Sequence, residues 1–84
     1  MITKELLMEK FPQFKIHRAN FKTGPFYLMV YKGLTFHIDI IGDKAFIRTF
    51  NWSQLSAEKH VDLTFDKVIE YINKKIIEHD TYGD

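Results

Sequence analysis

The sequence predicts an α+β fold: an antiparallel meander sheet of three to four strands, flanked by a short N-terminal helix and a longer C-terminal helix packed on one face. Two observations lead to this prediction. Three runs rich in β-branched and aromatic residues follow one another, with only short glycine-containing breaks between them. Segments whose apolar residues recur at helical spacing precede and follow these runs.

A short first helix is predicted over Lys4–Lys10. Thr3 can cap its N-terminus, because a threonine side chain accepts a hydrogen bond from the first turn. Pro12 ends it, since the residue before a proline is disfavoured in the α region. Residues 14–21 (FKIHRANF) then alternate imperfectly between apolar and polar side chains. This pattern indicates a first strand, in addition to the three central ones described next.

The three central strands are predicted at Phe26–Tyr31, Leu34–Ile41 and Lys44–Phe50. Lys32-Gly33 and Gly42-Asp43 separate them. Connections this short force neighbouring strands to pair as antiparallel hairpins.

The remaining chain is predicted to be a polar connector followed by the longer helix. Residues 51–62 form the connector, with a short helical turn starting at Ser53 or Ser56 as an alternative. Residues 63–79 carry an apolar stripe at helical spacing, made of Phe65, Val68, Ile69, Ile72 and Ile76. We expect the tail, residues 81–84, to be frayed.

A two-residue turn at Gly42-Asp43 predicts which side chains share a face of the sheet. Ile38 then pairs with Ile47 on an apolar face that should meet the helices. The other, outer face carries the pair His37 and Arg48 and the pair Asp39 and Phe46.

The first hairpin leaves two registers open. A two-residue Lys32-Gly33 turn places Phe26, Leu28 and Val30 on the outer face. A three-residue turn with Gly33 in the left-handed conformation places Tyr27, Met29 and Tyr31 there instead. In both registers the outer face is apolar.

An apolar outer face has two interpretations. Either the connector or the N-terminal segment folds over it, or it binds a partner, because large exposed apolar patches usually mark interaction sites. In the second case Phe46, Phe50 and Trp52 are the expected anchors, and His37, Asp39 and Arg48 set the register, as aromatic residues and arginine dominate interface energetics. A homodimer through the same face is a further expectation.

Length and composition predict one domain, residues 1–84, in a cytoplasmic chain. No cysteine is present, so there is no disulfide framework or thiolate metal site. No apolar run is long enough to span a membrane, and charges interrupt the N-terminal segment where a signal peptide needs apolar residues.

No pattern predicts an enzyme, a cofactor or a metal site. None of the four histidines has a metal-ligand spacing to another histidine. His37 and Asp39 could begin a site, yet Arg48 opposite them adds positive charge. Ser53 and Ser56 are better explained as helix caps than as nucleophiles.

Nucleic-acid binding is the alternative function. Residues 1–34 have a net charge of +4 (six cations and two anions), and they place basic groups beside aromatic ones, as single-stranded RNA or DNA requires. The candidate residues are Lys15, His17, Arg18, Lys22, Tyr27, Tyr31 and Lys32. Against this function, residues 51–84 have a net charge of −3 (four cations and seven anions), which would repel phosphate.

The sequence is therefore interpreted as a small non-enzymatic protein-binding module. We expect an inhibitor or regulator that occupies a surface of a larger partner protein. A small inhibitor encoded by a phage or mobile element fits this description.

Overall fold

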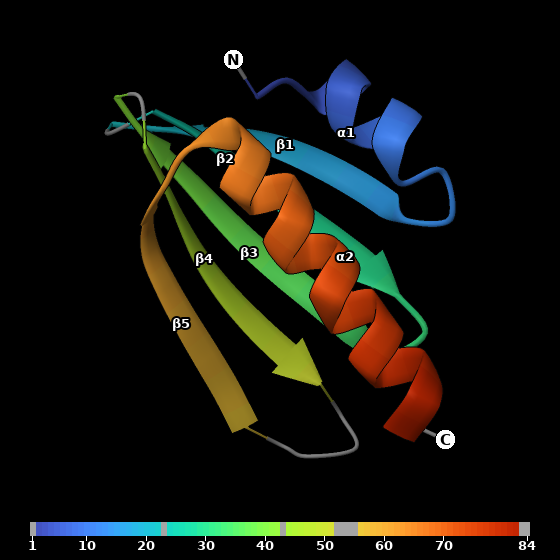
Figure 1. Cartoon of the computed structure of the whole chain (residues 1–84). Helices are drawn as coiled ribbons and strands as arrows, with labels where there is room; N and C mark the ends of the chain where they lie inside the picture. Colours follow the sequence, from blue (N-terminus) through green and yellow to red (C-terminus); the bar gives the residue numbers. More distant parts are fainter. Residues whose placement is uncertain (1, 23, 43, 52–55, 83–84) are drawn as a thin grey trace.

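The computed structural model describes residues 2–22, 24–42, 44–51 and 56–82, with the backbone alone at 51, 56–63, 65 and 82. Figure 1 shows a five-stranded antiparallel sheet and two helices. In chain order the elements are α1 (Lys4–Lys10), β1 (Lys15–Phe21), β2 (Gly24–Tyr31), β3 (Leu34–Ile41), β4 (Lys44–Asn51), β5 (Ser56–Leu63) and α2 (Phe65–Tyr82). The predicted α+β meander with a helix at each end is confirmed.

The strands lie in the sheet in chain order, so each pairs with its sequence neighbour. Lys32 and Gly33, between β2 and β3, have φ angles of 44° and 81°. Two consecutive positive φ values form a two-residue turn whose twist matches that of the flanking strands. The structure thereby selects the two-residue register of the first hairpin and pairs Leu28 with His37 and Val30 with Thr35.

The register of β3 against β4 confirms the sequence prediction. Ile38 lies opposite Ile47 on one face, and His37 lies opposite Arg48 on the other. Because side chains alternate along a strand, this register assigns every residue of the two strands to a face.

The connector prediction is wrong at Asn51, which ends β4, and from Ser56 onward. Ser56–Leu63 forms β5, which pairs with β4, so no helical turn starts at Ser56. If β4 were the edge of the sheet, its outward backbone donors and acceptors would face solvent. Pairing with β5 gives them partners, and this outweighs the local helix signals of the segment. The register of β4 against β5 shifts between Ala45 and Ile47. Ser53 and Trp52 lie outside the described residues.

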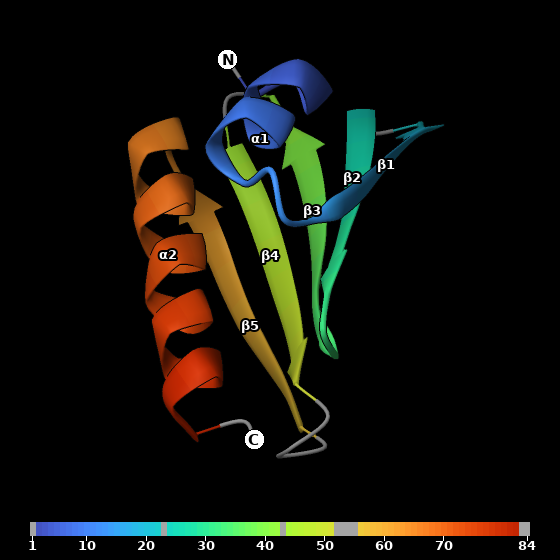
Figure 2. The ribbon, with the colours of Figure 1, turned by 90° about the vertical axis from the view of Figure 1, so that its right-hand side faces the viewer.

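Both helices lie on the same face of the sheet, as Figure 2 shows in side view. In α1, whose predicted bounds are confirmed, Thr3 Oγ1 accepts a hydrogen bond from the Leu6 N–H at 3.1 Å. Leu7 and Phe11 are buried beneath this helix. The first helix is therefore capped by its own sequence and held by its apolar stripe.

The longer helix is anchored through both apolar and polar contacts. Val68 and Ile72 are fully buried, and the Tyr71 hydroxyl lies 2.7 Å from Thr49 Oγ1 on β4. Near its end, His79 Nε2 lies 2.8 Å from the Lys32 carbonyl oxygen in the β2–β3 turn. The helix begins at Phe65 rather than at the predicted residue 63, and it extends to Tyr82, so Thr81 belongs to it rather than to the predicted frayed tail.

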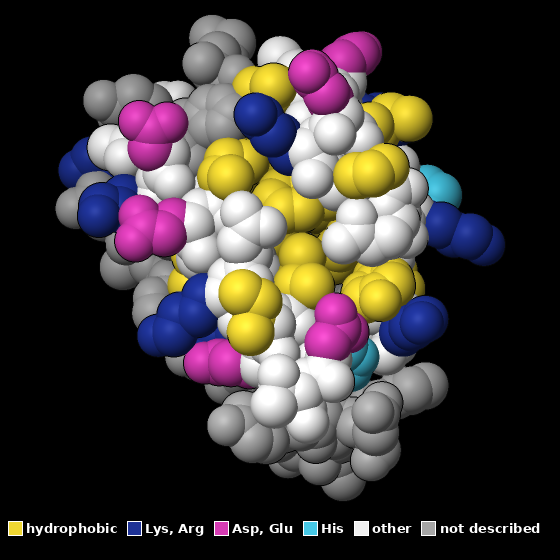
Figure 3. All heavy atoms as spheres, turned by 45° about the vertical axis from the view of Figure 1, so that its right-hand side comes forward, with side chains coloured by type: hydrophobic (Ala, Val, Ile, Leu, Met, Phe, Trp, Pro, Cys, Tyr) yellow, Lys and Arg dark blue, Asp and Glu magenta, His cyan; other side chains and the backbone are white. Residues whose placement is uncertain are grey.

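The core lies between the sheet and the helices. Its centre consists of Tyr27, Met29, Phe36, Ile38, Ala45 and Ile47 from the sheet together with Leu7, Phe11, Val68 and Ile72. Viewed from the helices, hydrophobic side chains remain visible among charges of both signs (Figure 3). No helix within the described residues is long and apolar enough to cross a membrane.

Truncating Leu7 should detach α1. Leu7 is 0% exposed, and we expect Leu7→Ala to lower the free energy of unfolding by about 2–5 kcal/mol, because a buried leucine leaves a cavity. Met8, the next residue, is 51% exposed, so Met8→Ala should change it by less than about 0.5 kcal/mol. Urea unfolding followed by circular dichroism measures both values. Equal effects of the two substitutions would contradict the placement of α1.

Candidate functional site

The candidate site is the face of the sheet that the helices leave open, here called the outer face. Its side chains follow from the strand registers and are not buried. They are Lys15, His17, Ala19 and Phe21 on β1; Phe26, Leu28 and Val30 on β2; Thr35, His37, Asp39 and Ile41 on β3; and Lys44, Phe46, Arg48 and Phe50 on β4. Within the described ranges, both helices lie on the opposite side (Figure 2).

A row of rings crosses four strands of the outer face. The ring centroids of Phe21 and Phe26 lie 5.1 Å apart, those of Phe26 and His37 5.5 Å, and those of His37 and Phe50 4.9 Å. These separations are typical of interacting aromatic side chains. Phe21 nevertheless stays 54% exposed, and Phe26, His37 and Phe50 are half-buried, so the row is preassembled and partly open to solvent.

Apolar side chains broaden this row into a patch. Leu28 and Phe46 are half-buried, and Val30 is exposed. None of them contributes to the buried core cluster on the helix side. An apolar surface of this kind is unusual on a soluble protein unless something binds it.

His37 lies at the centre of the patch and has a perturbed pKa. Partial burial lowers the pKa of His37 below its ordinary value of 6.5, and the neighbouring positive charge of Arg48 lowers it further. The carboxylate of Asp39 opposes this shift by favouring the charged imidazole. His37 is therefore mainly neutral at pH 7, and a neutral imidazole has one ring nitrogen able to donate a hydrogen bond and one able to accept.

The predicted protein-binding residues come together in the structure. His37, Asp39, Phe46, Arg48 and Phe50 all lie on the outer face of β3 and β4. Trp52 lies outside the described residues, so its predicted role stays a prediction.

Sequence reasoning left part of the patch undecided and missed another part. Phe26, Leu28 and Val30 depended on the turn at Lys32-Gly33, and the φ angles of that turn now place them on the outer face. Phe21 was missed because β1 alternates imperfectly, and only its pairing with β2 shows which way its side chains point.

The structure divides the predicted nucleic-acid-binding residues between the two faces of the sheet. Lys15 and His17 lie on the outer face, whereas Arg18 projects from the opposite side of β1. Tyr27 is 2% exposed, and Tyr31 packs against Phe14 at 5.3 Å on the helix side. Lys22 and Lys32 are exposed at opposite ends of β2, and Lys32 Nζ lies 5.4 Å from the centroid of the Tyr31 ring. The two tyrosines are thus separated from the basic side chains of the outer face.

Known proteins add no family assignment. Comparison of the chain with protein-family models, curated proteins and solved structures found no match. In the part of the chain that the structure describes, no three His, Asp or Glu side chains are grouped as metal ligands. The outer face is therefore identified as the candidate site from its geometry alone.

The charges around His37 predict the direction of three titrations. By NMR, we expect the imidazole of His37 to titrate with a midpoint below 6.5. Arg48→Gln should raise this midpoint, because it removes a charge that disfavours the imidazolium. Asp39→Asn should lower it further. Unchanged midpoints in both variants would contradict the electrostatic coupling.

The same shift has a consequence for stability. Because the folded pKa of His37 is lowered, the unfolded chain binds more protons once the pH falls below about 6.5. The contribution of His37 to the free energy of unfolding is complete above that pH and is lost as the pH falls through the folded pKa. Urea unfolding across this range in the wild type and in His37→Gln isolates the contribution, which should be absent in the variant.

Proposed function

We propose that this protein is a non-enzymatic binding module that inhibits or regulates a larger partner protein by occupying its surface. The observation that carries the proposal is the outer face: a ring-lined apolar patch across four strands with no described helix over it. Burying that patch against another protein would remove its apolar surface from water, which is the main driving force of protein association.

The chemistry of the outer face matches that of protein interfaces. Phe26, Phe46 and Phe50 supply the apolar centre, as aromatic anchors do in the middle of interfaces. Arg48 and Asp39 carry opposite charges beside them. Such charges contribute orientation and partner discrimination more than affinity.

His37 lies between the phenylalanine rings and the charged side chains of Arg48 and Asp39. It contacts Phe26 and Phe50, and its lowered pKa keeps it mainly neutral at pH 7. A neutral imidazole is less costly to bury than a charged one. We therefore expect partner affinity to fall as the pH drops through the pKa of His37.

Binding of single-stranded nucleic acid ranks second. Among the outer-face side chains that the structure describes on β1 to β4, Lys15, His17, Lys44 and Arg48 outnumber the acid Asp39. However, the tyrosines on which the sequence argument depended lie on the helix side. The apolar content of the patch favours a protein.

The test is partner capture with matched variants. The tagged chain is used to retrieve partners from its host, and the partner retained after nuclease treatment is purified for affinity measurement. The double substitution Phe46→Ala with Arg48→Ala should weaken that affinity by a hundredfold or more, because hot-spot residues each contribute about 2 kcal/mol or more. The circular dichroism spectrum should stay unchanged.

Matched controls lie on the helix side. Met8 and Ile77 are 51% and 66% exposed, and alanine at either position should leave the affinity unchanged. If the double variant Phe46→Ala with Arg48→Ala binds the partner as tightly as the wild type, the proposal is contradicted. Capture that disappears with nuclease would assign the face to nucleic acid, and a concentration-dependent dimer abolished by Phe46→Ala would assign it to a second copy of the chain.

A further inference from the structure

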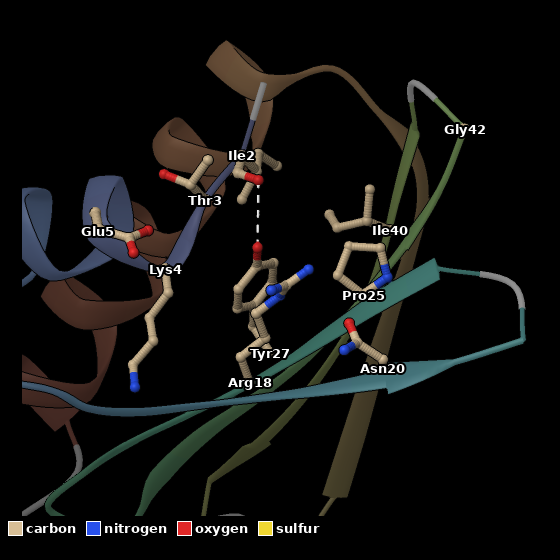
Figure 4. Close-up of a pocket in the computed structure, with 10 residues that line it drawn as sticks. All are labelled: Ile2, Thr3, Lys4, Glu5, Arg18, Asn20, Pro25, Tyr27, Ile40 and Gly42. Carbon is tan, nitrogen blue, oxygen red and sulfur yellow. Dashed lines mark hydrogen bonds between the residues drawn. The ribbon is translucent and has the colours of Figure 1, made fainter.

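A pocket of about 610 Å³ opens on the helix side of the sheet, away from the outer face. Figure 4 shows it between the segment that leads into α1 and the ends of β1, β2 and β3. Ile2, Pro25, Tyr27 and Ile40 form its apolar walls. Its volume lies within the range of about 300–1,000 Å³ that is usual for small-molecule sites.

One hydrogen bond shapes this pocket. The Tyr27 hydroxyl donates to the Ile2 carbonyl oxygen at 3.3 Å, which ties the N-terminal segment across the sheet (Figure 4). Tyr27 is otherwise buried, so its ring forms a fixed wall. Next to Pro25, a side chain at Gly24 would clash with the Ile40 carbonyl oxygen, so β2 and β3 lie in close contact there.

The polar lining is dominated by Arg18. Its side chain lies beside Tyr27 in Figure 4, and its guanidinium forms no hydrogen bond or ion pair with the described residues. Asn20, two residues along β1, projects from the same face. Lys4 and Glu5 also line the pocket, and their opposite charges cancel. The lining therefore has a net charge of +1 (two cations and one anion).

We propose that this pocket binds a small organic carboxylate. An arginine guanidinium holds a carboxylate through two parallel hydrogen bonds, and an unpaired one beside an apolar wall is available for this role. The Asn20 amide is a second donor for the same group. The apolar body of the ligand packs against Pro25 and Ile40. A single anionic group balances the net charge of the lining.

The test uses three carboxylates as probes: benzoate, phenylacetate and hexanoate. Each is titrated into the isotopically labelled full chain while backbone amide shifts are followed by NMR. We expect saturable shifts centred on Arg18, Asn20, Tyr27 and Ile40. Benzamide, which has the shape of benzoate without its charge, should produce none. Inorganic phosphate should not saturate the site, because it has no apolar body.

The two arginines of the chain lie on opposite faces and provide matched variants. Arg18→Gln should weaken carboxylate binding at least about tenfold, the loss expected for a charge-assisted pair. Arg48→Gln should leave it unchanged, although it affects the outer face. Because Arg18 is exposed, its variant should keep the wild-type pattern of amide signals.

Three results would overturn the carboxylate site: no saturable shifts with any of the three probes, equal shifts with benzamide, or unchanged affinity in Arg18→Gln. Equal saturation by inorganic phosphate would also reject it, by showing a site for bare anions. The proposed partner binding is tested by substitutions on the other face, so either proposal can fail while the other holds.

Discussion

The two-residue turn at Lys32-Gly33 decides which side chains of β2 meet the helices. Both residues have positive φ, and the resulting register buries Tyr27 and Met29 while it leaves Phe26 and Leu28 on the outer face. A slip of one residue would exchange the two sets, because side chains alternate along a strand. The core and the candidate binding surface therefore depend on the same turn.

The longer helix holds this turn in place. A carbonyl oxygen can only accept, so His79 Nε2 donates the hydrogen bond to Lys32. The contact joins residues 47 positions apart and connects the end of α2 to the β2–β3 hairpin. A second polar contact, between Tyr71 and Thr49, connects the same helix to β4. The register of the sheet and the position of the helix thus stabilise each other.

From β1 to β4 the sheet carries apolar side chains on both faces, yet the two helices occupy only one. On the helix side, Phe36, Ile38 and Ile47 are removed from water. On the outer face Phe21 contacts Phe26, and His37 contacts both Phe26 and Phe50. The proposed partner surface and the proposed carboxylate pocket therefore lie in different layers and use different arginines.

Local sequence determined much of this architecture. Thr3 and Pro12 determined the bounds of α1, and the alternation of β3 and β4 around Gly42 determined their register, because caps, turns and period-two patterns act over a few residues. These signals were sufficient to bring His37, Asp39, Phe46, Arg48 and Phe50 onto one face.

Only the tertiary structure decided the rest. Ser56–Leu63 reads as a polar connector and becomes β5 because the edge of β4 is there to pair with it. Phe21 joins the outer face, and Arg18 joins the pocket, through the pairing of β1 with β2. The outer face has no helix over it because both helices pack on the other side of the sheet. Each of these outcomes arises from contacts between residues far apart in the chain, which no local pattern specifies.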